Sequence, residues 1–327
     1  MTTRTRYFVI ASLLVLTVGL GTGLVAYYTG FQVIGRSRSG PQELAYVPGR
    51  AAVVAYADVH EVMTSELRHK VHDAAPVPED GQKEFENQTG INIETDIDHI
   101  VACLDPGAGG QNGAGMVLAR GRFNDAKIES LMRAHGARVE DYRSKRLITA
   151  EEQHGSETLS VAFLQPGLVA FGTSAMVKSA IDLQSGGDNV TNNDEMMALV
   201  RSLESGNAWA VGRFDALRTK AHLPEAMSTQ IPPIKWFSVS SHVNGGIRGV
   251  IRAETDDEQS ATNLRDVVRG FMALAKMQAG AKPEYQAMLQ SLELGGTGKT
   301  VALSFSVPSE VFDVIGKHGQ MNHPKPR

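Results

Sequence analysis

The chain has very little cysteine and no surplus of positive charge. Cys103 is the only cysteine among 327 residues, which excludes an intramolecular disulfide and a zinc site built from cysteines. Because Cys103 lies in the apolar run HIVACLD, we interpret it as a buried, unreactive thiol. Asp and Glu number 36 against 32 Lys and Arg, giving a net charge of -4, so we expect no nucleic-acid partner.

A complete phosphate-binding loop is also missing, although residues 293–305, ELGGTGKTVALSF, look like one. Gly298, Lys299 and Thr300 supply the second half of the G-x-x-x-x-G-K-[ST] pattern. The first glycine would stand at position 293, where a glutamate carboxylate would repel a polyphosphate. The residues before the loop have helical spacing and those after it alternate like a strand, whereas a P-loop needs a strand first and a helix second. We therefore predict a helix C-cap followed by a glycine turn.

Two further patterns fall short of a catalytic or metal site. His69 and His72 lie three residues apart, with Glu66 nearby, on a predicted helix that carries several charged side chains, which is typical of a solvated face. Ser174 follows a predicted strand and precedes a helix, as a nucleophile does in G-x-S-x-G, but Met176 stands where the second glycine is needed. We interpret Ser174 as a helix cap.

An acidic cluster and an aromatic pair complete the candidates. Glu94, Asp96 and Asp98 are spaced by two, so on a strand they would share a face and could meet calcium, but the glycine and distal glutamate of an EF-hand are missing. Trp236 and Phe237 fit a hydrophobic core better than a ligand platform. The sequence thus predicts no catalytic, cofactor-binding or metal-binding residue, and no cofactor.

The N-terminus contains the one long apolar run. Arg4 and Arg6 precede residues 7–28, YFVIASLLVLTVGLGTGLVAYY, which carry no charge. Residues 8–26 would form a helix of roughly 29 Å, close to the hydrocarbon thickness of a bilayer. Tyrosines stand at both ends of this run, as in the aromatic belts of membrane proteins. We therefore predict that residues 7–28 bind the lipid bilayer as a single transmembrane anchor.

A cleaved signal peptide is the alternative to this anchor. Its apolar stretch is usually shorter, and Leu24 stands where a small residue is wanted for cleavage after Ala26. Gly19 and Gly23 form a G-x-x-x-G step that can bring two membrane helices close, so a homodimer is a further partner hypothesis. Residues 271–279, FMALAKMQA, are too short for a second span. We expect a single-pass protein of the inner membrane with its body in the periplasm or outside the cell.

The body alternates strand and helix patterns in two parts. The phrases GRFNDA at 121–126 and GRFDA at 212–216 both stand where a predicted strand passes into a helix. This suggests an α+β fold of two related halves, each an antiparallel sheet with helices on one face. The predicted organisation is an anchor or signal peptide at 1–30, a stalk at 31–48, a first half at 49–185, a connecting segment at 186–206, a second half at 207–318 and a disordered tail at 319–327.

Local patterns predict the individual elements of the body. Asn124 and Gly136 bound a complete helix signature, and Thr255 with Glu258 forms a capping box for the longest helix. The apolar face predicted for this long helix consists of Ala261, Leu264, Val268, Phe271 and Ala275. A hairpin with an Asn-Gly turn is expected in 234–254. Other predicted helices cover 60–73, 83–90, 174–186, 215–223 and 309–319, and other predicted strands cover 51–59, 97–104, 116–123, 207–214 and 300–307, with three more strands in 137–174.

In layout, and in the phrase AYVPGRAAVVAYADVHEV at 45–62, the chain resembles bacterial proteins with one N-terminal membrane anchor and an α+β domain of unknown function. The resemblance implies localisation and fold class and carries over no functional residue. Our leading hypothesis is a membrane-tethered, non-enzymatic envelope protein that binds a partner or helps to assemble one. The alternatives are an envelope hydrolase with dispersed active-site residues, and a carrier of lipid or another apolar ligand between sheet and long helix.

Overall fold

The computed structural model describes residues 40–74, 79–108, 113–151, 158–218, 232–278 and 283–311. The predicted anchor at 7–28, with Gly19 and Gly23, lies outside these residues. Within the described ranges, no helix combines the length and the apolar character that a membrane span requires. The chain forms two compact units, and among the described residues unit 1 takes its members from Arg36–His60 and Glu79–Ser202, and unit 2 from Glu61–Pro78 and Leu203–Arg327.

Unit 1 is built on an antiparallel sheet whose strand order is β1-β2-β3-β7-β6-β5-β4. Strand β1 pairs with β2 along its full length, with Val54 opposite Cys103. The outermost strand of this series, β4, has the sequence RVEDY, and its charges protect an edge from pairing with another chain. The strands are β1 (Val53–Asp58), β2 (Ile97–Asp105), β3 (Ala114–Gly121), β4 (Arg138–Tyr142), β5 (Lys145–Glu151), β6 (Thr158–Gln165) and β7 (Leu168–Thr173).

The helices of unit 1 follow their local signals closely. In α7 the Asn124 side chain accepts from the Lys127 N–H, as the cap signature predicts, and Gly136 takes a positive φ of 90° after the last turn. Helix α8, which packs against β6 and β7, buries Met176, Val177, Ala180 and Ile181. The helical elements are η2 (Gln42–Tyr46), α5 (Glu79–Thr89), α6 (Ile93–Asp96), α7 (Asp125–Ala134), α8 (Ser174–Leu183), η3 (Val190–Asn192) and α9 (Asp194–Ser202).

The turn between β4 and β5 was missing from the sequence prediction, which placed three strands in 137–174 where the structure has four. Arg143 and Ser144 have φ values of 47° and 62°, the conformation of a tight hairpin turn that usually needs Gly or Asn. The carboxylate of Asp182 on α8 accepts from Arg143 Nε at 2.6 Å and from the Tyr142 hydroxyl at 3.1 Å. These tertiary contacts stabilise a turn for which the local sequence carries no signal.

Residues 186–195 pack onto the beginning of unit 1. The Val190 N–H donates to the Val47 carbonyl at 2.8 Å, and the Gly49 N–H donates to the Asp188 carbonyl at 3.1 Å. Pro48 and Asn189 form an isolated β-bridge between these hydrogen bonds. The division between the two units falls after Ser202, inside the predicted connecting segment 186–206.

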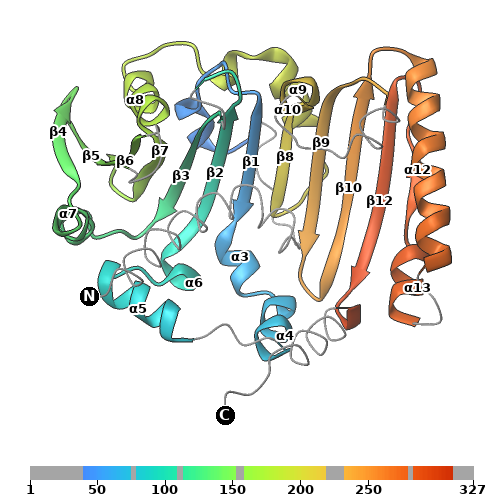
Figure 1. Cartoon of the computed structure of the whole chain (residues 1–327), viewed down its shortest axis with the longest axis horizontal. Helices are drawn as coiled ribbons and strands as arrows, with labels where there is room; N and C mark the ends of the chain where they lie inside the picture. Colours follow the sequence, from blue (N-terminus) through green and yellow to red (C-terminus); the bar gives the residue numbers. More distant parts are fainter. Residues whose placement is uncertain are drawn as a thin grey trace. The chain divides into compact units, whose positions relative to one another are not determined.

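Unit 2 also contains antiparallel strands, in the order β11-β12-β10-β9-β8. The predicted hairpin is confirmed, because β9 and β10 pair on either side of Asn244 and Gly245. Both units therefore combine helices with antiparallel sheets, which confirms the α+β class (Figure 1). The elements are α4 (Glu66–Ala74), β8 (Ala208–Arg213), α10 (Phe214–Arg218), β9 (Ile234–Val243), β10 (Gly246–Thr255), α12 (Glu258–Gln278), α13 (Pro283–Gln290), β11 (Glu293–Gly295) and β12 (Thr300–Pro308).

The helix predicted over 60–73 is two helices in the structure, α3 (Val59–Met63) and α4. The break is at Ser65, whose hydroxyl donates to the Val62 carbonyl at 2.7 Å and accepts from the Arg68 N–H at 3.2 Å. Serine thus ends one helix and begins the next, which is the usual role of a short polar side chain at a helix boundary.

The start of the long helix α12 also differs from prediction. Thr255 is the last residue of β10, and its hydroxyl donates to the carbonyls of Asp257 and Lys299. The side chain that caps the helix belongs to Asp257, whose Oδ1 accepts from the Ser260 N–H at 2.7 Å. The predicted capping box of Thr255 and Glu258 is therefore wrong. Thr255 belongs to β10, whereas the residue directly before the helix is Asp257.

The first half of α12 covers one end of the unit 2 sheet. Ala261 and Leu264 are 0% and 5% exposed and form a core cluster with Val301 of β12. Val268 packs against the same cluster, together with side chains from β9, β10 and β11. This confirms the predicted apolar face of the helix as far as Val268.

Candidate functional site

The P-loop-like segment joins two strands of a hairpin. Residues 293–295 form the short strand β11, which pairs antiparallel with β12 after the turn. The strand after the turn is confirmed, but the predicted helix C-cap is wrong, because β11 lies between α13 and the turn, which closes the hairpin instead. Its backbone carbonyls are occupied, since Gly298 O accepts from Arg265 and Lys299 O accepts from the Thr255 N–H at 3.0 Å. The loop therefore serves to attach α12 to the sheet.

Within unit 2, helix α4 packs against the β9–β10 hairpin through residues other than its histidines. The Leu67 N–H donates to the Asn244 carbonyl at 2.8 Å, and the Leu67 side chain packs on Val243. Lys70 Nζ donates to the Ser309 hydroxyl at 2.7 Å. His69 is exposed, as the solvated-face interpretation predicts, and the His72 side chain lies outside the described residues. No group of three metal-ligating side chains occurs in the described part of the chain.

Ser174 is the first residue of α8 and not its cap, so the cap interpretation is wrong. Its hydroxyl donates to the Thr158 carbonyl at 3.0 Å, and its oxygen lies 2.6 Å from the Ser160 hydroxyl. Because Ser174 has one hydroxyl proton, Ser160 must donate in that contact, and Thr149, 2.9 Å from Ser160, must donate to Ser160. This chain of three hydroxyls fastens α8 to β5 and β6.

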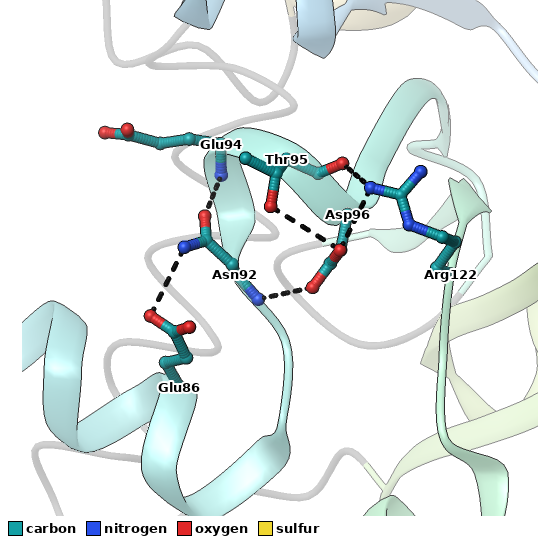
Figure 2. Close-up of polar contacts among 6 residues, drawn as sticks. All are labelled: Glu86, Asn92, Glu94, Thr95, Asp96 and Arg122. Carbon is teal, nitrogen blue, oxygen red and sulfur yellow. Dashed lines mark hydrogen bonds and ion pairs between the residues drawn. The ribbon is translucent and has the colours of Figure 1, made fainter.

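The acidic triad is divided between two elements. Glu94 and Asp96 belong to the short helix α6, whereas Asp98 belongs to β2, so the three carboxylates do not share a strand face. Asp96 Oδ2 accepts from the Asn92 N–H at 2.8 Å, and its Oδ1 forms an ion pair with Arg122 at 3.1 Å (Figure 2).

Figure 2 also shows the rest of this corner, in which the Glu94 side chain points away from Asp96. The Asn92 side chain accepts from the Glu94 N–H at 3.0 Å and donates to Glu86 on α5 at 3.3 Å. The polar groups therefore form a local turn that joins α5, α6 and the end of β3, and its carboxylates are committed to that structural task.

Cys103 and Trp236, which the sequence analysis placed in the core, are both buried in the structure. Cys103 is 7% exposed, and burial raises the pKa of its thiol to about 12, so it is unreactive at neutral pH. Trp236 is 4% exposed, while its neighbour Phe237 points to the other side of β9 and contacts the Phe214 ring edge-to-face at 6.5 Å between centroids.

Sequence reasoning missed a buried charged cluster in unit 1. Glu43, on the 3-10 helix η2, is 4% exposed. Its carboxylate accepts from Arg120 Nε on β3 at 2.9 Å, and its other oxygen lies 3.1 Å from His99 Nε2 on β2. The His99 ring also stacks at a tilt on Tyr56 of β1, with 5.6 Å between centroids.

The electrostatics of this cluster favour an ionised Glu43. Burial by itself raises the pKa of Glu43, but the interactions with His99 and Arg120 and with its own backbone N–H lower that pKa to about 2. The carboxylate ties η2 to two strands more than fifty residues away in the sequence. We assign it a structural role, and no short-range pattern could have identified it.

The most exposed apolar surface among the described residues lies on the second half of α12. Phe271, Leu274 and Met277 are 42%, 54% and 80% exposed. Phe271 belongs to the face that was predicted to be buried, and this part of that prediction is wrong. Leu274 and Met277 are different in this respect, because helical spacing turns them away from the face of Ala261, Leu264 and Val268 and toward solvent.

Comparison with known proteins adds little to this picture. No protein-family model matches the chain. No curated protein matches it either. Among solved structures, "Structure of crystal form I of TP0453" matches with a TM-score of 0.46 and 9% identity, covering 86% of this chain and 99% of that one. A likeness of this size carries no argument about function.

Proposed function

We propose that this chain is a membrane-tethered protein of the cell envelope that binds a partner through its extracytoplasmic body and does not catalyse a reaction. The main observation in support of a membrane tether is the uncharged stretch 7–28, which is preceded by Arg4 and Arg6 and followed by a folded α+β body. In support of a binding role, two candidate groups for chemistry have structural tasks: Ser174 fastens α8, and Asp96 organises a turn.

Membrane attachment is tested by fractionation of the full chain expressed in a bacterium. The intact protein should stay in the membrane fraction after high-salt washing and leave it only with detergent. Intact mass must include residues 1–26, because loss of these residues would identify a cleaved signal peptide. Leu14→Arg combined with Leu16→Arg should release the protein, since each central arginine costs about 3 kcal/mol in a membrane helix. Leu14→Ile with Leu16→Ile is the matched control and should remain bound.

The side of the membrane is tested with protease added to spheroplasts. The body should be digested without lysis if it lies outside the cytoplasm, and a protected body would contradict the proposal. The partner is then sought by crosslinking the full-length protein in its native membrane and identifying the captured protein. Capture that is lost with the double arginine variant but retained with the isoleucine control would tie partner binding to membrane attachment.

A further inference from the structure

The second half of α12 combines exposed apolar and basic side chains. Phe271, Leu274 and Met277 succeed one another at three-residue intervals and are 42%, 54% and 80% exposed. At about 100° per residue, this spacing places them along one flank of the helix. The stripe is confined to the part of the helix beyond Val268, the last residue that packs on the core cluster.

The charges of this part of the helix have one sign. After Asp266, the helix contains Arg269 and Lys276 and no acidic residue. Arg269 forms an exposed ion pair with Asp266 at 2.7 Å, which solvent screens, and Lys276 stands in the last turn. Helical spacing puts both basic residues on the flank opposite the apolar stripe. A helix with one apolar flank and one basic flank is typical of segments that lie in the surface of a bilayer.

We propose that residues 268–278 of α12 dock on an anionic phospholipid surface, with Phe271, Leu274 and Met277 entering the boundary between headgroups and acyl chains. The proposal rests on the proposed membrane tether. Residues 29–39 separate the predicted anchor from Gly40, and a fully extended segment of this length reaches at most roughly 38 Å. The folded body is thereby held near the bilayer, which raises the effective concentration of lipid at its surface.

A second copy of the chain fits this surface less well. Three side chains offer a small area compared with the roughly 800 Å² per partner of a stable interface. A symmetric contact through residues 268–278 would also offer Arg269 and Lys276 no carboxylate, because this part of the helix contains none. Anionic headgroups instead attract these residues.

The test uses the full chain in phosphatidylcholine vesicles with and without phosphatidylglycerol. An environment-sensitive fluorophore is attached to Met277→Cys, and for comparison to Thr262→Cys, which is exposed on the polar flank of the same helix. The native Cys103 will not react, because it is buried and the pKa of its thiol is raised to about 12. Nitroxide-labelled lipid then reports which of the two positions contacts the bilayer.

We expect several-fold stronger quenching at position 277 than at 262 in vesicles that contain phosphatidylglycerol. The difference should shrink with added salt and disappear when Phe271→Glu and Leu274→Glu are introduced. Because both side chains are exposed, circular dichroism should show that this variant remains folded. Equal quenching at the two positions would overturn the proposal, as would shielding at 277 that comes from a crosslinked second copy.

The membrane tether and the docking of α12 give separate readouts. A chain that fails to float with vesicles at all would contradict the tether. A chain that floats, but whose probe at 277 stays as accessible to water as the probe at 262, would contradict the docking of α12 alone.

Discussion

Glu43 and Arg120 are 77 positions apart in the chain and form a short pair, with the Arg120 guanidinium donating to Glu43 Oε1 at 2.9 Å through Nε and at 2.8 Å through Nη2. The glutamate side chain is 5% exposed and the arginine side chain 26%. Two nitrogens of one guanidinium thus meet a single buried oxygen, a charge-assisted contact that fixes η2 on the sheet of unit 1.

We expect Glu43→Gln to lower the free energy of unfolding by about 2 kcal/mol, because the variant leaves Arg120 without its counter-charge in a largely buried place. Urea unfolding of the protein measures this change. Glu140→Gln is the matched control: Glu140 pairs with Lys178 at 2.9 Å but is 56% exposed, so its loss should change stability by less than about 0.5 kcal/mol.

The same carboxylate predicts a loss of stability in acid. The pKa of Glu43 is lowered from 4.5 to about 2 in the folded protein, so its contribution is present in full above pH 4.5 and is lost as the pH falls toward 2. The slope of stability against pH in this window should be smaller in Glu43→Gln than in the native protein. Equal slopes would show that Glu43 keeps an ordinary pKa.

His242 predicts a second pH effect at milder acidity. It is 6% exposed on β9, opposite Arg248 of β10, and burial followed by the charge of Arg248 lowers its pKa from 6.5 to about 2. Only the unfolded chain then takes up the proton below pH 6.5, so stability is present above that pH and falls below it by up to about 1.4 kcal/mol per unit. Between pH 6.5 and 5, His242→Gln should therefore flatten the dependence of the free energy of unfolding on pH, and an unchanged dependence would contradict the lowered pKa of His242.

The cap of α12 is tested by a pair of neighbouring aspartates. Asp257→Ala should destabilise the protein by about 1 kcal/mol, because its side chain accepts from the Ser260 N–H at the helix start. Asp256→Ala, one residue earlier and exposed, should have little effect. Thermal unfolding of both variants measures the two losses of stability. An equal loss of stability in the two variants would contradict the assignment of Asp257 as the cap.

Two glycines predict opposite effects of the same substitution. A Cβ on Gly121 would lie 2.0 Å from the Asp96 carbonyl oxygen, so Gly121→Ala must push backbone apart and should destabilise by several kcal/mol, on the order of 3. A Cβ on Gly270 meets nothing within 4 Å, and the site is an exposed helix interior. Gly270→Ala should stabilise by about 0.5 to 1 kcal/mol, measured by the same unfolding experiment.

Local signals predicted several elements correctly and failed where distant groups intervene. Asn124 caps α7 by accepting from the N–H three residues later, and Asn244 with Gly245 closes the β9–β10 hairpin. Both features depend on a few neighbouring residues and could therefore be predicted from the sequence. The turn at Arg143 and Ser144 depends on Asp182, almost forty residues further on. Ser174 has the local pattern of a cap, but its partners Thr158 and Ser160 lie on β6.

By itself the sequence determined the α+β class, the helix and hairpin boundaries set by nearby caps and turns, and the prediction of an N-terminal membrane segment. These properties depend on periodicity and on contacts within a few residues. Only the tertiary structure decided that Glu43 meets Arg120 and His99, that Asp96 and Asp98 belong to different elements, and that Phe271 on α12 is exposed. Those relationships depend on which strands lie side by side, and that arrangement follows from the packing of the whole chain.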